Sequence, residues 1–96
     1  MAVGVELKFA GATTDQYDQL VAKMGYKAGG PGAPGGIFHC VTKTEDGLRV
    51  IDVWQTREVF EKFAQEKIGP LSQEVGISNP PQISFFEVHN YLTAAS

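Results

Sequence analysis

Hydrophobic residues alternate with small or charged ones along the start of the chain, from Val3 to Phe9. Valine, leucine and phenylalanine take every second position, so one side of an extended segment is apolar and the other is not. The pattern predicts a half-buried β-strand, which ends at Gly11. A strand with two such different faces is expected in a sheet that packs against helices on one side only.

A helix is predicted next, over residues 13–24. Thr13 and Gln16 have the spacing of a capping box, in which each side chain pairs with a backbone N–H of the other residue. The apolar residues that follow lie at i, i+3, i+4 and i+7, on one helical face: Tyr17, Leu20, Val21 and Met24. Gly25 is a typical helix stop.

Residues 37–43 and 48–55 predict a β-hairpin, with Asp46-Gly47 in the turn. Side-chain parity places two sets of residues on opposite faces of this hairpin. One set is Ile37, His39, Val41, Val50, Asp52 and Trp54, and the other is Phe38, Cys40, Ile51 and Val53. We expect the second set to pack on the helices, with Cys40 as an inert small hydrophobe, and the first set to lie on the open face.

Thr56 is the predicted cap of a second helix. Its buried stripe is Val59, Phe60, Phe63 and Ala64. We expect Gly69-Pro70 to interrupt this helix. Residues 83–92 predict the last strand, because they are rich in β-branched and aromatic residues. On this strand Phe86 and Val88 are expected to face the helices, and the open face is expected to carry Phe85, Glu87, His89 and Tyr91.

The order strand–helix–strand–strand–helix–strand predicts one α+β domain over residues 1–96. Its fold class is ferredoxin-like, a four-stranded antiparallel sheet with two helices on one face. An open face that carries Trp54, Phe85 and Tyr91 is too apolar to remain in water. We therefore expect a homodimer in which two such faces enclose a small-molecule cavity.

Composition excludes several other classes of partner. The chain is 43% hydrophobic and 20% charged, as in ordinary globular proteins, and its net charge is −3. Lysine and arginine are scattered singly, so neither nucleic-acid binding nor a basic membrane-surface helix is expected. No apolar run approaches the roughly 20 residues that span a bilayer. The start of the chain does not resemble a signal peptide and Cys40 is the only cysteine, which favours the cytoplasm.

The most specific chemical hypothesis is a pair between His39 and Asp52 on adjacent strands. A carboxylate that accepts from an imidazole fixes its tautomer, which suits a general base for a phenol or an activated C–H. Trp54 and Tyr91 would then stack on an aromatic substrate, with Phe85, His89 and Glu6 on the same face. The alternative is that the pair is structural. No metal site is expected, because nothing has ligand-type spacing.

Residues 28–36 consist of glycine, proline and alanine and cannot hold a regular element. Residues 30–35 fit the letters of a dinucleotide-binding fingerprint, but they follow a helix and lead into a strand, so that interpretation is rejected. A connecting loop is expected, with a lid over a cavity mouth as the functional alternative.

The segments VIDVWQTREVFEKFA and FFEVHNYL, in this order of elements, resemble the dimeric α/β-barrel superfamily and its antibiotic-biosynthesis-monooxygenase-like group. The matching positions are Asp52, Trp54, Thr56, Phe60 and Phe63. The resemblance implies a homodimer with a ligand cavity between sheet and helices or inside the barrel.

The resemblance also implies a choice of activities. The leading one is oxygenation of an aromatic or polyketide-type substrate by O2, without a cofactor. The alternatives are an isomerase or cyclase that uses the same base without oxygen, and a non-catalytic binding or dimerisation module. The haem-degrading branch of the superfamily uses a histidine on a helix as the iron ligand. Neither predicted helix of this chain contains a histidine, so haem degradation is disfavoured.

Overall fold

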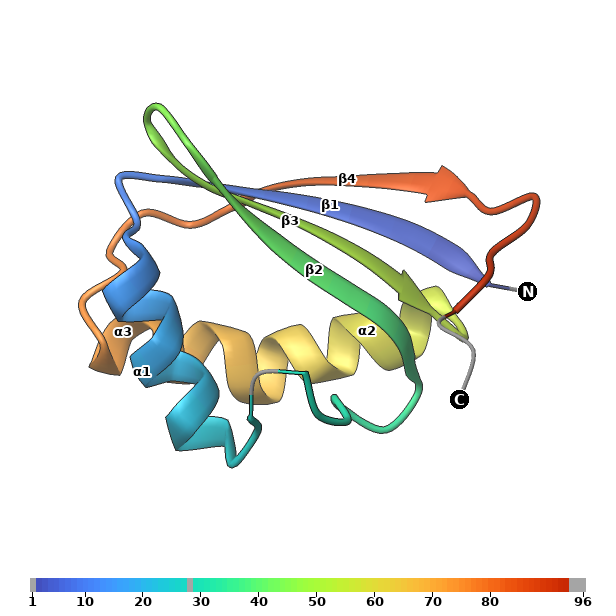
Figure 1. The fold of residues 1–96 in the computed structure, drawn as a ribbon, viewed down its shortest axis with the longest axis horizontal. Helices are drawn as coiled ribbons and strands as arrows, with labels where there is room; N and C mark the ends of the chain where they lie inside the picture. The colour runs from blue at the N-terminus through green and yellow to red at the C-terminus, as the bar shows by residue number, and fades with distance from the viewer. Residues whose placement is uncertain (1, 28, 94–96) are drawn as a thin grey trace.

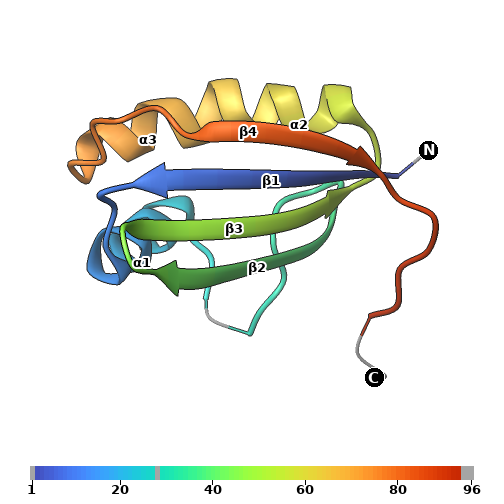
Figure 2. The same cartoon turned by 90° about the horizontal axis from the view of Figure 1, so that it is seen from above.

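The computed structural model describes residues 2–27 and 29–93 and shows a four-stranded antiparallel sheet with the helices on one face (Figure 1). The elements are β1 (Val3–Ala10), α1 (Thr14–Met24), β2 (Gly36–Thr44), β3 (Gly47–Trp54), α2 (Arg57–Phe63), the π-helical turn η1 (Ala64–Ile68), α3 (Gly69–Glu74) and β4 (Gln82–Glu87). Across the sheet the strands run β2-β3-β1-β4, as Figure 2 shows from above. The predicted ferredoxin-like α+β fold is confirmed. No helix in the described part of the chain is long and apolar enough to cross a membrane.

The hydrophobic core lies between the sheet and the helices, with β1 at its centre. β1 pairs with β3 on one side and β4 on the other, so Val5 faces the core beside its partners on both strands. Val5 and Leu7 are almost fully buried, and so is Phe60 of α2, which belongs to the same hydrophobic cluster. The alternation predicted for the first strand is therefore confirmed, with its apolar side toward the helices.

Both ends of α1 are fixed by the residues that the sequence indicates. The Thr13 side chain accepts from the backbone N–H of Gln16, and the Gln16 side chain accepts from that of Thr13, so the capping box is complete. Gly25 takes the left-handed conformation at the C-terminal end, with φ of 84°. Gln16 and Lys23 also tie the helix to the α3 region, through Gly76 and Glu74.

The second helical region is continuous from Arg57 to Glu74, and the predicted interruption was wrong. Thr56 caps its start by accepting from the Val59 N–H. Pro70 has no N–H to donate, and its ring would clash with a carbonyl of the preceding turn. The chain accommodates it by widening into η1, where the Gly69 N–H donates to the carbonyl of Ala64. The helix then resumes as α3.

β2 and β3 form the predicted hairpin, with Thr44 paired to Gly47 across a two-residue turn. His39 lies directly opposite Asp52 in this register. The prediction that His39 and Asp52 share one face of the hairpin is therefore confirmed. Gly47 also lies against the end of β1, where a side chain would have no room.

Replacing Gly47 by alanine is expected to destabilise the fold. The new Cβ would approach the carbonyl oxygen of Phe9 to well under 3.0 Å, and a backbone oxygen cannot swing aside. Such overpacking costs about 1–3 kcal/mol, so thermal unfolding should show a melting temperature at least about 4 °C lower. Gly32→Ala is the matched control, because a Cβ there meets no other atom within 4 Å. Equal melting temperatures for the two variants would contradict this account of Gly47.

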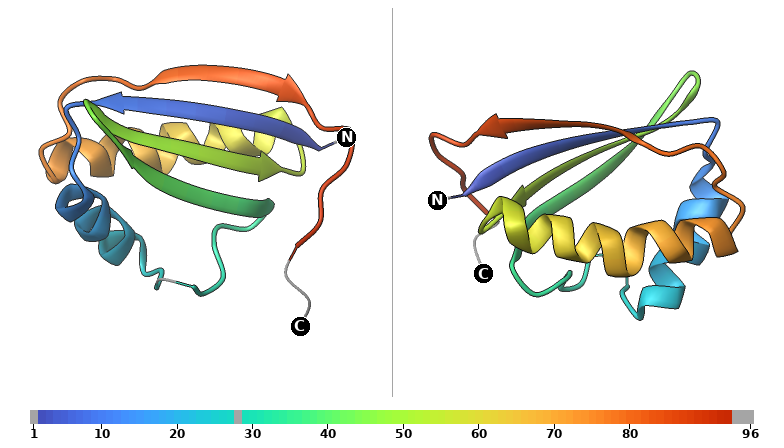
Figure 3. Two further views of the ribbon diagram at one scale, coloured as in Figure 1. Left: turned by 45° about the horizontal axis from the view of Figure 1, so that its top comes forward. Right: turned by 180° about the vertical axis from the view of Figure 1, so that it is seen from behind.

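The face of the hairpin that packs against the helices is the opposite of the predicted one. Alternate residues of β3 are buried, namely Leu48, Val50, Asp52 and Trp54. They lie opposite the core-facing residues of β1. Phe38 is 45% exposed on the other side of the sheet, and the parity places Cys40 there with it. Figure 3 shows that no helix covers this second face. The sequence predicts these polar residues on the open face of the sheet, but the hydrogen bonds described below allow Asp52 to be buried on the helix side.

The predicted last strand also differs in extent and orientation. β4 ends at Glu87, because Glu87 pairs with Val3, where β1 begins. Phe85 faces the helices, where its ring packs edge-on to Phe60 with centroids 5.8 Å apart. Phe86 lies over Gly4 on the open face and is 44% exposed. The face assignments predicted for Phe85 and Phe86 were therefore wrong.

Candidate functional site

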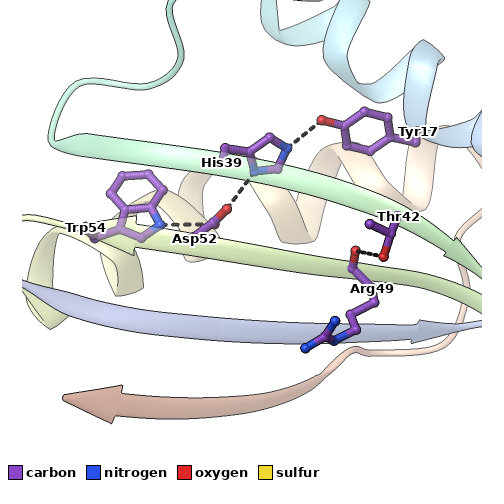
Figure 4. A network of polar contacts seen from close by, with 6 residues as sticks. All are labelled: Tyr17, His39, Thr42, Arg49, Asp52 and Trp54. Carbon is purple, nitrogen blue, oxygen red and sulfur yellow. Dashed lines mark hydrogen bonds and ion pairs between the residues drawn. The ribbon is translucent and has the colours of Figure 1, made fainter. Parts of the chain in front are cut away.

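A chain of four hydrogen-bonded side chains joins the sheet to α1 (Figure 4). Tyr17 Oη lies 2.5 Å from His39 Nε2, and His39 Nδ1 lies 2.6 Å from Asp52 Oδ1. Trp54 Nε1 donates to the other carboxylate oxygen, Oδ2, over 3.0 Å. We call these residues the Tyr17–Trp54 relay. The predicted pairing of His39 with Asp52 is confirmed as a contact, while its chemical role stays a prediction.

The hydrogen bonds of the relay favour one arrangement of its protons. An ionised carboxylate only accepts hydrogen bonds, so Asp52 holds the N–H of Trp54 on one oxygen and the Nδ1–H of His39 on the other. With its proton on Nδ1, the neutral imidazole has a lone pair on Nε2. Tyr17 must then be the donor in its contact with His39. The geometry thus selects the tautomer whose free nitrogen can take up a proton.

Burial decreases along the relay from the sheet centre to its edge. Trp54 is 4% exposed and the Asp52 side chain 5%, whereas the His39 side chain is 46% exposed. His39 is more open because β2 is an edge strand. The relay therefore connects a buried carboxylate to a group that solvent or a ligand can reach.

Tyr17 is held in its neutral form. Burial raises the pKa of its hydroxyl, and the negative charges of Asp52 and Asp18 add to the effect. The ring lies almost parallel to that of His39, at 11° with centroids 5.9 Å apart. At neutral pH the Tyr17 hydroxyl is therefore a proton donor to His39.

Trp54 is a packing residue whose indole N–H serves the relay. Its ring contacts Phe60 and Phe63 of α2, with centroids 5.7 and 5.1 Å away. The end of the glycine-rich loop covers it further, since a Cβ on Gly36 would lie 3.6 Å from the indole. The sequence predicts that Trp54 stacks on a substrate, but its ring is already enclosed by Phe60 and Phe63 and only 4% exposed.

The other predicted site residues lie away from the relay. Glu6 is on the open face, where it accepts from Arg49 Nε at 2.7 Å, and this contact lowers the pKa of its carboxyl. It lines a hollow of about 570 Å³ beside the hairpin tip. Phe85 belongs to the core beside Phe60. His89 and Tyr91 follow the end of β4, and Tyr91 is 46% exposed.

Residues that could bind a metal are not gathered together. Within residues 2–27 and 29–93, no group of three or more His, Cys, Asp or Glu side chains is placed to hold an ion. The helices of the same ranges contain no histidine, since His39 is on β2 and His89 follows β4.

Tyr17 is the member of the relay that sequence reasoning missed. Its position in the apolar stripe of α1 marks it as a core residue, and it does pack against the core. A tyrosine on such a stripe carries a hydroxyl that needs a partner, which was the only available hint. Which partner it finds depends on how α1 crosses the edge of the sheet.

The overall shape of the chain matches solved structures over almost its whole length. SnoaB from Streptomyces nogalater, a cofactor-independent oxygenase, aligns over 97% of both chains with a TM-score of 0.59 and 15% identity. A Deinococcus radiodurans protein with the provisional name antibiotic biosynthesis monooxygenase aligns over 100% of both chains, with a TM-score of 0.57 and 10% identity. The chain has the antibiotic-biosynthesis-monooxygenase-like fold. The likeness to these structures confirms the predicted fold.

The same fold occurs in a protein whose structure contains bound porphyrins. MhuD, in a mutant with two manganese protoporphyrin IX molecules bound per active site, aligns over 98% of this chain and 100% of its own, with a TM-score of 0.51 and 16% identity. The sequence itself matches no family model and no curated protein. The activity of this chain must therefore be argued from its relay.

Proposed function

We propose that the chain is a small-molecule enzyme that removes a proton from an aromatic or polyketide-type substrate and lets the resulting anion react with O2. The observation that carries the proposal is the 2.6 Å contact between His39 Nδ1 and Asp52 Oδ1. Asp52 is buried and also bonded to Trp54, so it holds the imidazole in the tautomer that a base needs. The fold that the chain shares with a cofactor-independent oxygenase supports the same chemistry.

The reaction balances without an added reductant. A base takes a proton from an activated CH2 group, and the carbanion forms a C–O bond with O2 to give a peroxide. The proton returns from the imidazolium to the peroxide, which loses water and leaves a ketone. The substrate is oxidised from CH2 to C=O, and O2 is reduced to the new carbonyl oxygen and one water. The side chains of the protein therefore need only bind the substrate, move the proton and exclude side reactions.

The proposal can be tested with anthrone, a tricyclic ketone whose central CH2 is acidified by its neighbours. Oxygen uptake and anthraquinone formation should occur together, one O2 per anthrone, above the rate without protein. Product that differs from anthraquinone and forms equally fast without O2 would support an isomerase or cyclase instead. No acceleration with anthrone or with a hydroquinone such as 1,4-naphthohydroquinone would count against an oxygenase and favour a binding module.

We further propose that a second copy of the chain covers the open face of the sheet. One end of that face carries apolar side chains from β2, β3 and β4, and the Phe86 ring lies over Gly4 of β1 between them. The apolar residues are Phe38, Cys40, Ile51, Val53 and Phe86. Phe38 and Phe86 are nearly half exposed in the single chain. Such a patch is typical of a protein interface. The relay lies on the other side of the sheet, so pairing would leave it accessible.

Replacing Phe86 by glutamate is expected to break this pairing. A charge in the middle of a buried apolar patch is costly unless it is paired. Sedimentation velocity should give a dimer for the unmodified protein and a monomer for Phe86→Glu at the same concentration. Ile83→Glu is the matched control, because Ile83 has a similar exposure on the same strand but shares the face of Leu7. A monomeric unmodified protein, or two variants that associate equally, would contradict the proposed interface.

A further inference from the structure

The Tyr17 hydroxyl is hydrogen-bonded to the nitrogen of His39 that would act as the base. Its oxygen lies 2.5 Å from Nε2, while Nδ1 is bonded to Asp52. Both ring nitrogens of His39 are therefore engaged within the chain. A substrate proton can reach the imidazole only if Tyr17 moves away or if Tyr17 itself passes the proton on.

Several contacts hold Tyr17 in place. The capping box fixes the start of α1 only one turn from it. Gln16 donates to the carbonyl of Gly76, and Lys23 pairs with Glu74 at 3.4 Å, so α1 is joined to the α3 region along its length. The Tyr17 ring itself packs against the core. Withdrawal of the hydroxyl would require these contacts or the ring packing to change.

We infer that Tyr17 is the catalytic residue that receives the substrate proton, as the outer member of a relay that ends on His39. This inference rests on the proposed function. The substrate O–H or C–H bond breaks and its electrons stay on the substrate as an anion. The proton binds Tyr17 Oη while the Tyr17 O–H bond breaks, and the displaced proton binds His39 Nε2. Asp52 faces the imidazolium that forms.

The chemistry of Tyr17 fits such a relay. Because burial and nearby negative charge raise the pKa of its hydroxyl, Tyr17 does not act as a free phenolate. In the relay it is neutral before and after the transfer, since it gains one proton as it loses another. A substrate with a phenol or enol hydroxyl, or an acidified CH2, could donate to the outward lone pairs of its oxygen.

The test uses Tyr17→Phe, which removes only the hydroxyl, with Tyr26→Phe as the control at another partly buried tyrosine. We expect kcat/KM for oxygen uptake with anthrone to fall by at least about tenfold in Tyr17→Phe and to be unchanged in Tyr26→Phe. In mixtures of H2O and D2O, the unmodified protein should give a curved dependence of rate on deuterium fraction, because two protons move together. A rate for Tyr17→Phe equal to or above that of the unmodified protein would overturn the inference.

The outcomes separate this inference from the function on which it rests. If His39→Ala loses activity while Tyr17→Phe keeps it, the base stands and only the role of Tyr17 fails. If His39→Ala keeps full activity, His39 is not the base and the relay fails with it, whereas no activity in the unmodified protein would mean that the proposed function itself fails. Nitrogen-15 NMR of the histidines needs no substrate: the relay requires the proton on Nδ1 of His39 and a shift of the Nε2 signal in Tyr17→Phe. A proton on Nε2 in the unmodified protein would exclude Tyr17 as its donor.

Discussion

Replacing His39 by alanine is expected to lower kcat/KM for the oxygenation of anthrone by a factor of about 10²–10⁴, the usual contribution of a general base. Among the four relay side chains, that of His39 alone has a basic nitrogen lone pair, and it is bonded to both Tyr17 and Asp52. Because 46% of this side chain is exposed, its removal should leave the core intact. Steady-state oxygen uptake, with circular dichroism to verify the fold, measures both effects.

The matched control for this variant is His89→Ala. His89 is the second histidine of the chain and follows the end of β4, where it takes no part in the relay. It was also a candidate for substrate binding in the sequence, so the comparison tests both positions. A large loss in His89→Ala, with normal turnover in His39→Ala, would move the active base away from the relay.

Asp52→Asn is expected to reduce turnover to a similar degree and to cost stability as well. The carboxylate accepts from two N–H groups, those of His39 and Trp54. An amide has one oxygen and one NH2 group, so one of these donors would face another donor. If the NH2 group faces His39, it favours the tautomer whose Nε2 carries the proton and cannot accept another. We expect kcat/KM to fall by about 10²-fold or more, and the unpaired buried donor to cost about 1–3 kcal/mol.

Turnover and denaturant unfolding of the same preparation separate these two effects. Glu66→Gln, at an exposed position of η1, is the control for the loss of one negative charge. The double variant His39→Ala with Asp52→Asn should be no less active than the worse of the two single variants, because the residues act as a unit. A loss of stability in Asp52→Asn with unchanged kcat/KM would mean that the pair is structural.

Local patterns in the sequence were sufficient to predict most of the fold. The capping box of Thr13 and Gln16 and the stop at Gly25 depend only on neighbours in the chain, and they fix α1. The contact between His39 and Asp52 follows from the short turn of the hairpin, since parity within a hairpin does not depend on the rest of the molecule. These are the features that the structure reproduces.

The orientation of the hairpin could not be obtained in the same way. Both of its faces carry apolar residues, so composition did not decide which one meets the helices. The decisive facts are the pairing of Val5 with Asp52 and the burial of Leu48 at the start of β3. The prediction places the polar pair on the open face, whereas its hydrogen-bond partners Trp54 and Tyr17 allow it to lie on the helix side of the sheet. The position of the site, between sheet and helices, is a consequence of these long-range contacts.

Proton exchange without oxygen tests the central claim most directly, because it detects the bond that the base breaks. Anthrone would be kept in D2O with O2 excluded, and the loss of its CH2 signal followed by proton NMR with the unmodified protein, with His39→Ala and without protein. If the relay ending on His39 is the base, the unmodified protein accelerates the exchange and His39→Ala does not exceed the rate without protein. Equal acceleration by the unmodified protein and His39→Ala, or none by either, would contradict the account.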